Sequence, residues 1–286
     1  MVRRHELSDE EWDVLSGLLP RTETGRPRRD DRVVLNGIVW KLRTGSAWRD
    51  VPERYGSWRT LYTRFRRWAL DGTFARMLET VQAQNDAAGD IDWLVSVDST
   101  ITRAHQHAAG ARKKGATSAE AAHTHALGRS RGGLTTKIHL ACDGRGRPLG
   151  FVLTNDCIQL EQVLAQIKVR RPGPGRPRTR PGHLLGDKGY SSRRIRNYLR
   201  KHGIPHTIPE RSDQQANRRR RGSNGGRPAS FDKERYKQRN VVERCFNALK
   251  QYRAIATRYD KTRESYEAAL TIASLLMWIL PFEDRP

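Results

Sequence analysis

The chain has 286 residues, enough to bury a sizeable core without disulfide or metal staples. It carries 54 Lys and Arg against 31 Asp and Glu, and this net charge of +23 indicates a polyanionic partner. Residues 1–90 hold 16 basic and 14 acidic residues, whereas residues 91–286 hold 38 and 17, so the positive field belongs to the C-terminal part. A basic surface with no specific partner is the alternative, and an excess this large argues against it.

Several classes of protein are excluded by simple patterns. Cys142, Cys157 and Cys245 are odd in number and lack CxxC spacing, which indicates reduced thiols rather than disulfides or a zinc cage. Residues 1–13 are acidic and polar, unlike a secretory signal. The longest apolar segment, 268–280, falls short of the roughly 20 residues that cross a bilayer and predicts a buried terminal helix. We therefore expect a cytoplasmic protein with no membrane partner.

The first 85 residues show helical periodicity. Ser8 and Glu11 form a capping box at the start of a helix, and further helices are predicted over 31–43 and 57–70. The last of these carries four arginines: Arg59, Arg64, Arg66 and Arg67. Short helices joined by tight turns, the last rich in arginine, favour a small helix-turn-helix-like domain that binds DNA. The near-neutral charge of this region leaves a dimerisation or packing domain open.

From residue 92 the pattern changes to short β-type runs. Asp143-Gly144 marks a hairpin turn between two of them, and helical stretches at 159–169 and 192–202 separate the later ones. The runs cover 93–97, 134–141, 149–153, 183–185 and 205–208. An antiparallel meander followed by β/α alternation predicts, for residues 91–286, an α/β domain with a mixed sheet flanked by helices.

Three segments rich in Arg, Pro or Gly are expected to be loosely ordered: 108–130, 170–181 and 211–227. Such runs are usually solvated loops. Beside an acidic site they are also natural clamps for the backbone of nucleic acid, and we favour this interpretation for the three together.

Two aspartates and one glutamate stand out as candidate metal ligands. Asp98 follows the first β run and Asp187 the fourth, so both are predicted at the carboxyl ends of strands, where ligands gather. With Glu243 they form an all-oxygen donor set that favours Mg²⁺ or Mn²⁺ over zinc. Two such ions can clamp an in-line phosphoryl displacement. Aspartate at a strand end is also a common turn former, so neither aspartate decides the matter alone.

Glu243 belongs to a helix predicted over residues 236–250. Tyr236, Arg239, Glu243 and Lys250 recur at intervals of three, four and seven, which places them within about 60° of one helix face. The opposite face carries apolar residues: Val241, Val242, Cys245 and Leu249. A carboxylate flanked by two cations and a tyrosine suits a site that holds a metal ion and a phosphate together. The paired histidines, His105 with His107 and His123 with His125, lie in a polar loop and favour solvation over zinc binding.

These motifs carry a resemblance. The chain resembles bacterial insertion-sequence transposases of the DDE type, whose catalytic domain has a ribonuclease H-like fold. The resemblance covers nearly the whole chain, including the N-terminal helical head and the complete Tyr-Arg-Glu-Lys signature. Its motifs are Val97-Asp-Ser-Thr100, Arg131 to His139, Gly186-Asp-Lys-Gly-Tyr190, Arg239 to Arg244, and Arg258-Tyr-Asp-Lys261.

The resemblance implies a division of roles. It assigns catalysis and the binding of two Mg²⁺ ions, with Mn²⁺ as a substitute, to Asp98, Asp187 and Glu243. It assigns DNA contacts to Tyr236, Arg239, Lys250 and Lys188, and the arginines of the helical head to the terminal inverted repeats. The implied activity is cleavage of phosphodiester bonds and transfer of 3′-OH ends to target DNA, by a homodimer in a synaptic complex at the bacterial nucleoid.

Two alternatives share this sequence pattern. One is a ribonuclease H-like nuclease without strand transfer, and the other is a catalytically inactive DNA-binding protein derived from a transposase. One departure bears on activity, because related chains often carry a longer turn with Pro and Gly where this chain passes directly from Thr154 to Cys157.

Overall fold

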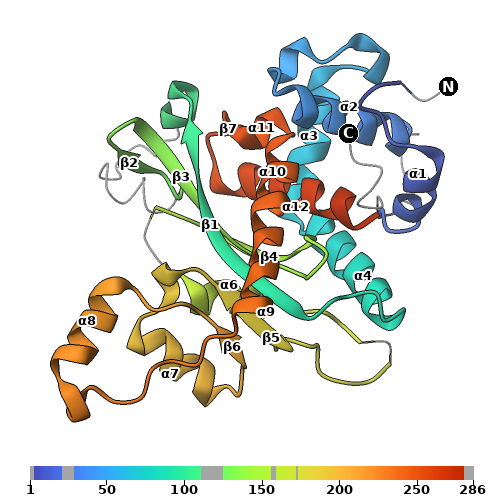
Figure 1. The fold of residues 1–286 in the computed structure, drawn as a ribbon. Helices are drawn as coiled ribbons and strands as arrows, with labels where there is room; N and C mark the ends of the chain where they lie inside the picture. The colour runs from blue at the N-terminus through green and yellow to red at the C-terminus, as the bar shows by residue number, and fades with distance from the viewer. Residues whose placement is uncertain (1–2, 21–28, 111–124, 156–158, 172, 280–286) are drawn as a thin grey trace.

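The computed structural model describes residues 3–20, 29–110, 125–155, 159–171 and 173–279 (Figure 1). The expectations for His123, for Cys157 and for the turn that follows Thr154 therefore lie wholly or largely outside the described residues, as does most of the segment 108–130.

The N-terminal region is helical, as predicted. Helix α1 (Asp9–Ser16) begins with the expected capping box, in which the Ser8 hydroxyl accepts a hydrogen bond from the Glu11 amide at 3.1 Å and the Glu11 carboxylate accepts one from the Ser8 amide at 2.7 Å. It is followed by α2 (Asp31–Thr44), α3 (Trp58–Leu70) and α4 (Thr73–Ala87). The connection from α2 to α3 contains two 3-10 helices, so it is longer than the tight turn that we expected.

A seven-stranded mixed sheet forms the centre of the molecule, which confirms the predicted fold class. Its strands are β1 (Leu94–Ala104), β2 (Gly128–Ser130), β3 (Gly133–Cys142), β4 (Pro148–Thr154), β5 (His183–Gly186), β6 (His206–Thr207) and β7 (Thr257–Arg258). β3 pairs antiparallel with β1, β2 and β4, whereas β5 and β7 run parallel to β1 and β6 runs parallel to β5.

Strand β1 is much longer than the predicted run 93–97. It continues to Ala104 because Ser99, Thr100 and the residues after them keep their pairing with β3, although their polar and exposed character gave no β-type signal. On the other edge of β1, the parallel ladder with β5 ends at Val97, and the pairing with β7 begins only at Arg103. This edge of β1 is therefore free of strand partners, within the described residues, between these two points.

The C-terminal helices differ in two places from the prediction. The segment 211–227 is not a loose loop, since it contains α8 (Ser212–Arg220) and a 3-10 helix, Gly222–Gly225. The predicted helix 236–250 is divided into α9 (Lys233–Lys237) and α10 (Val241–Lys250) by the 3-10 helix Gln238–Asn240. The other helices are α6 (Leu160–Gln166), α7 (Arg193–Lys201), α11 (Arg253–Ala256) and α12 (Arg263–Ile279). The helix predicted over 159–169 thus ends at Gln166, whereas the helix predicted over 192–202 is confirmed by α7.

One cluster of buried side chains runs from the N-terminal helices through the sheet to α12, which is buried as expected. Polar contacts cross the same junction: Gln82 of α4 and Trp278 of α12 both donate to the Pro148 carbonyl, at 3.0 and 2.7 Å. The N-terminal helices therefore sit firmly on the C-terminal part, and the division into domains 1–85 and 91–286 stays a prediction. None of the helices in the described ranges is long and apolar enough to cross a membrane.

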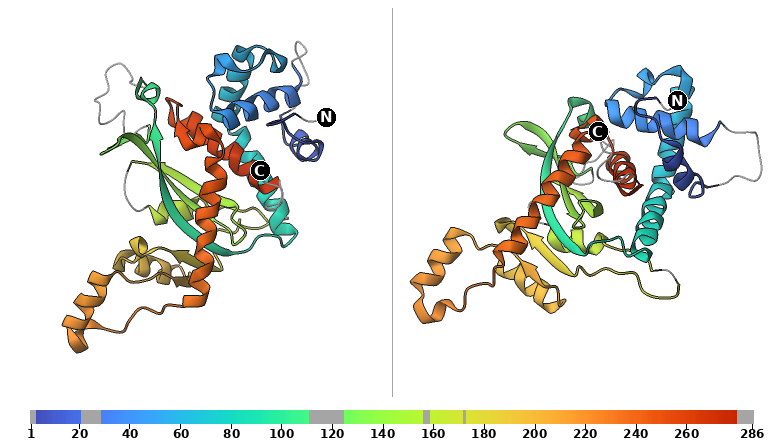
Figure 2. Two further views of the ribbon diagram at one scale, coloured as in Figure 1. Left: turned by 45° about the horizontal axis from the view of Figure 1, so that its top comes forward. Right: turned by 45° about the vertical axis from the view of Figure 1, so that its right-hand side comes forward.

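Figures 1 and 2 show how these parts are arranged. The helices α1, α2 and α3 lie at one end of the molecule, and α7 and α8 lie at the opposite end. Between them, α9 and α10 form one rod that passes beside β1. The free edge of β1 and the residues of this rod meet in the middle of the molecule.

Candidate active site

The register of the sheet brings Asp98 and Asp187 together. Val97 is paired with Gly186 in the last pair of the parallel ladder, and in both segments the residue that follows is an aspartate. We expected Asp98 at the end of its strand, but it lies within β1, at the point where the neighbouring strand β5 ends. This position brings the carboxylates of Asp98 and Asp187 close to each other. The Asp98 carboxylate accepts a hydrogen bond from the Ser99 amide at 2.7 Å, and Asp187 accepts one from the Gly189 amide at 2.9 Å.

Arg239 connects the third carboxylate to this pair. Its guanidinium forms an ion pair with Asp98 and lies 3.5 Å from Glu243, one helical turn further along the rod. The Asp98 side chain is 15% exposed, whereas that of Glu243 is 51% exposed. Asp98 is thus largely shielded from solvent, whereas Glu243 lies on a side of the site that is open to a large substrate.

The three carboxylates influence one another electrostatically. The pKa of Asp98 is raised to about 6, first by burial and then by the like charges of Asp187 and Glu243, while the Ser99 amide and Arg239 act in the opposite direction. Burial likewise raises the pKa of Tyr236, whose phenol also feels the charges of Arg239, Asp187 and Asp98. These residues therefore form one electrostatic cluster.

Lys250 lies at the other end of α10 and contacts the same strand. Its ammonium donates a hydrogen bond to the Thr100 hydroxyl at 2.7 Å. Because side chains alternate along a strand, Thr100 shares a face of β1 with Asp98. The sequence prediction missed Thr100, although its position two residues after Asp98 is the signal that would have found it.

The N-terminal and C-terminal parts of the chain match two families of proteins. Residues 7–78 match putative transposases of the IS4/5 family, and residues 90–278 match the transposase DDE domain. The chain belongs to the DDE transposase family. This confirms the resemblance drawn from the sequence motifs, and it makes the chain an insertion-sequence transposase.

Individual relatives agree with this assignment. The chain is 32% identical over 146 residues to a putative transposase for insertion sequence element IS402 of Burkholderia cepacia, an alignment that covers 50% of this chain and 62% of the relative. It is 27% identical over 150 residues to a putative transposase for insertion sequence element IS6501 of Brucella ovis, covering 51% of this chain and 99% of the relative. An uncharacterized protein, y4sN, of Sinorhizobium fredii is 40% identical over 109 residues, covering 37% and 83%.

The candidate donor set fits the hard divalent cation that DDE transposases generally use. Asp98, Asp187 and Glu243 offer carboxylate oxygens alone, which suit Mg²⁺ and Mn²⁺. Burial is the main cause of the raised pKa of Asp98, and the like charges of Asp187 and Glu243 add a repulsion that a bound cation would offset. As it stands, no group of three Asp, Glu, His or Cys side chains in the described residues is arranged to hold a metal ion, and it is the Arg239 guanidinium that lies between Asp98 and Glu243.

Gly189 lies against the Asp187 carboxylate. A Cβ atom at residue 189 would lie 2.9 Å from Asp187 Oδ1, closer than such atoms approach, so Gly189→Ala should turn the carboxylate without unfolding the chain. We expect strand cleavage to fall by about 10²-fold in an assay with labelled DNA, because a displacement of about 1 Å within an active site costs about that much.

Gly17→Ala is the matched control for this substitution. Gly17 has a helical backbone conformation and open space around its Cβ position, so activity and thermal stability should both be retained. Full activity of Gly189→Ala would show that the orientation of Asp187 is unimportant for cleavage.

The four arginines of α3 are placed very differently from one another. Arg64 is 8% exposed, forms an ion pair with Asp31 and lies over the Trp68 ring. Arg66 donates to the hydroxyls of Thr262 and Ser265 at 3.2 and 3.0 Å. Both thus hold α3 within the protein, whereas Arg59 and Arg67 are exposed. Of the predicted DNA contacts in the head, these two exposed arginines are the ones that solvent and ligands reach.

Proposed function

We propose that this transposase binds the terminal inverted repeats of its element, cleaves phosphodiester bonds there, and transfers the freed 3′-OH ends to target DNA. Asp98, Asp187 and Glu243 are the proposed catalytic residues. A homodimer that synapses two ends and acts at the bacterial nucleoid is part of the same proposal.

The observation that supports this proposal most directly is the meeting of Asp98 and Asp187 at the end of the β5 ladder, with Arg239 and Glu243 facing them. The side chains that the described contacts bring together here are carboxylates, cations and hydroxyls, which suit a substrate that carries phosphate. The net charge of +23 provides the long-range attraction for DNA.

The proposed roles of the residues follow from their positions. The three carboxylates would hold two Mg²⁺ or Mn²⁺ ions, which offset charge on the phosphate and on the attacking and leaving oxygens. Arg239 is close enough to the carboxylates to donate to a phosphate bound there, and Lys250, held by Thr100, adds a second cation beside it. Tyr236 and Lys188 are proposed to contact the DNA strand at the margin of the site.

Strand transfer separates this proposal from a nuclease of the same fold. Purified protein is given pre-cleaved element ends with free 3′-OH groups, a supercoiled plasmid and Mg²⁺. We expect joined products that disappear when the 3′ ends carry dideoxynucleotides, because the attacking oxygen is then missing. Cleavage of intact ends without any joining would identify a nuclease, and sequence-specific binding without cleavage in Mg²⁺ or Mn²⁺ would identify an inactive DNA-binding derivative.

A further inference from the structure

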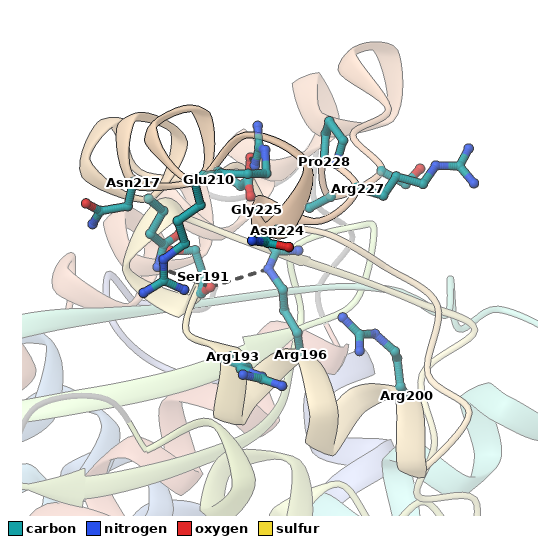
Figure 3. A pocket seen from close by; sticks show the side chains of 15 residues that line it. Ser191, Arg193, Arg196, Arg200, Glu210, Asn217, Asn224, Gly225, Arg227 and Pro228 are labelled. Carbon is teal, nitrogen blue, oxygen red and sulfur yellow. Dashed lines mark hydrogen bonds and ion pairs between the residues drawn. The ribbon is translucent and has the colours of Figure 1, made fainter.

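A large basic hollow lies between α7 and the segment that contains α8 (Figure 3). It has a volume of about 1140 Å³, and its walls carry one acidic residue, Glu210. We call it the arginine basin after the six arginines that line it: Arg193, Arg196, Arg200, Arg218, Arg221 and Arg227. An excess of cations this large, gathered from two segments of the chain, favours an anionic ligand.

The α8 segment contributes nothing to the hydrophobic core. α8 has no buried side chain, which is unusual for a helix in a folded protein. It is held by polar contacts instead: Arg218 forms an ion pair with Glu210, and the Gln214 amide donates to the Ser191 carbonyl at 3.4 Å. Gly225 lets the chain pack closely on α8, since a Cβ atom there would lie 2.2 Å from the Arg218 carbonyl oxygen. The segment therefore builds a wall of the basin rather than a core.

The six arginines differ in how they are held. Arg200 is exposed and donates to the Asn197 side-chain oxygen at 3.1 Å. Arg196 is buried and donates to the carbonyls of Ser191 and Ile208, and Arg218 is paired with Glu210, so these two shape the basin. Arg193, Arg221 and Arg227 are exposed and make no side-chain hydrogen bond or ion pair within the described ranges. The Ser191 hydroxyl, on the same wall, is buried and also lacks a partner there. The basin thus offers unused donors together with a positive field.

The lining favours a sugar-phosphate backbone over a nucleobase or a free nucleotide. Among the described lining residues there is no aromatic side chain, so the basin has no platform on which a base would stack. The free arginines come from α7 and from the segment after α8, on separate parts of the rim. Spaced guanidinium groups of this kind suit successive phosphates along a strand.

The place of the basin in the fold indicates which DNA it would take. Ser191 follows directly after the 3-10 helix Lys188–Tyr190, which Asp187 caps, and Ser230 precedes the segment leading into α9. One wall of the basin therefore begins four residues after Asp187 of the candidate active site. The helices α7 and α8, which contribute its walls, lie in Figures 1 and 2 at the opposite end of the molecule from α1, α2 and α3. DNA that runs from these N-terminal helices past the active site reaches the basin only beyond the point of cleavage.

We propose that the arginine basin binds the backbone of the duplex DNA that flanks the element, on the far side of the scissile bond from the N-terminal helices. This rests on the proposed function, because it assumes that element ends are bound and cut at Asp98, Asp187 and Glu243. Binding through phosphates alone is independent of sequence, as suits flanking DNA, which lies outside the element.

The test removes the three free cations of the basin together, in the triple variant Arg193→Gln, Arg221→Gln, Arg227→Gln. A matched triple variant, Lys201→Gln, Arg219→Gln, Lys233→Gln, removes the same charge from exposed positions outside the basin on α7, α8 and α9. Each full-length protein is titrated by fluorescence anisotropy against two duplexes. One carries the inverted repeat with about two helical turns of flanking DNA, and the other ends at the cleavage point.

We expect the basin variant to lose about tenfold or more in affinity for the flanked duplex and little for the duplex that ends at the cleavage point. On the flanked duplex, its slope of log affinity against log salt should be smaller by about 2 to 3, which corresponds to three phosphate contacts. Hydroxyl-radical protection of the flank should also disappear. The matched variant should retain both the preference and the protection.

Three outcomes would overturn the assignment of the basin: equal losses on both duplexes, identical behaviour of the two triple variants, or a protected flank in the basin variant. Thermal unfolding measured by circular dichroism shows that each variant is folded. A wild-type protein that binds neither duplex would refute the proposed function itself. This outcome differs from failure of the basin proposal alone, in which the wild-type protein still binds element ends.

Discussion

Replacing Asp98 or Asp187 with asparagine, or Glu243 with glutamine, is expected to reduce strand cleavage in Mg²⁺ by about 10³-fold or more. Each substitution keeps the size of the side chain and removes one negative charge from the proposed donor set, and metal catalysis of this kind supplies several kcal/mol. Binding of element ends should persist, because the cations that attract DNA are unchanged. Cleavage of a labelled inverted-repeat duplex and anisotropy on the same duplex measure the two effects separately.

Glu243→Gln is the most informative of the three, since its carboxylate is half exposed and contacts only Arg239 among the described residues. Its effect on folding should be negligible. Glu234→Gln, which removes an exposed acid from α9 in the same rod, is the matched control and should cleave at the wild-type rate. Undiminished cleavage by any of the three site variants would remove that residue from the proposed catalytic set.

The largest effect on stability is expected from Arg147→Ala, at about 3 to 5 kcal/mol of unfolding free energy. Asp143 is fully buried and pairs with the Arg147 guanidinium at 2.7 Å, and burial already raises its pKa. Arg147 also donates to Asn85 and to Asp90 near the end of α4, and it stacks on Trp278 of α12. Its removal would leave a buried carboxylate without its cation at the junction of α4, the β3–β4 hairpin and α12.

Arg145→Ala provides the control on the same turn. Arg145 also pairs with Asp90, but its side chain is 56% exposed, so its loss should cost no more than about 1 kcal/mol. Urea denaturation followed by tryptophan fluorescence gives both values. Equal effects of the two substitutions would show that burial of Arg147 does not matter.

Much of the fold followed from periodicity, because capping, turn and alternation signals are local. Ser8 with Glu11 and the Asp143-Gly144 turn lie where the sequence placed them. The length of β1 did not follow, because its second half is held by pairing with β3 rather than by an apolar pattern of its own. The same is true of α8, a helix that polar contacts hold without a buried face.

The candidate site was predictable in part for a similar reason. The spacing of Arg239, Glu243 and Lys250 marked one helix face, and the motifs named the two aspartates. The contact of Arg239 with Asp98 spans 141 residues, so only the folded chain reveals it. The spacing of arginines in α7 also indicates the basin. Arg193, Arg196 and Arg200 recur at intervals of three and four, which places them on one helix face, and all three line the arginine basin.

The continuous core between the N-terminal helices and α12 bears on where cleavage takes place. Buried packing, the contact of Arg66 with α12 and the ion pairs of Arg147 join the two parts at this junction. Under the proposed function, the distance from the helices that read the inverted repeat to the residues that cut is then a fixed length. The number of base pairs between the sequence that the protein recognises and the end of its element would therefore be constant.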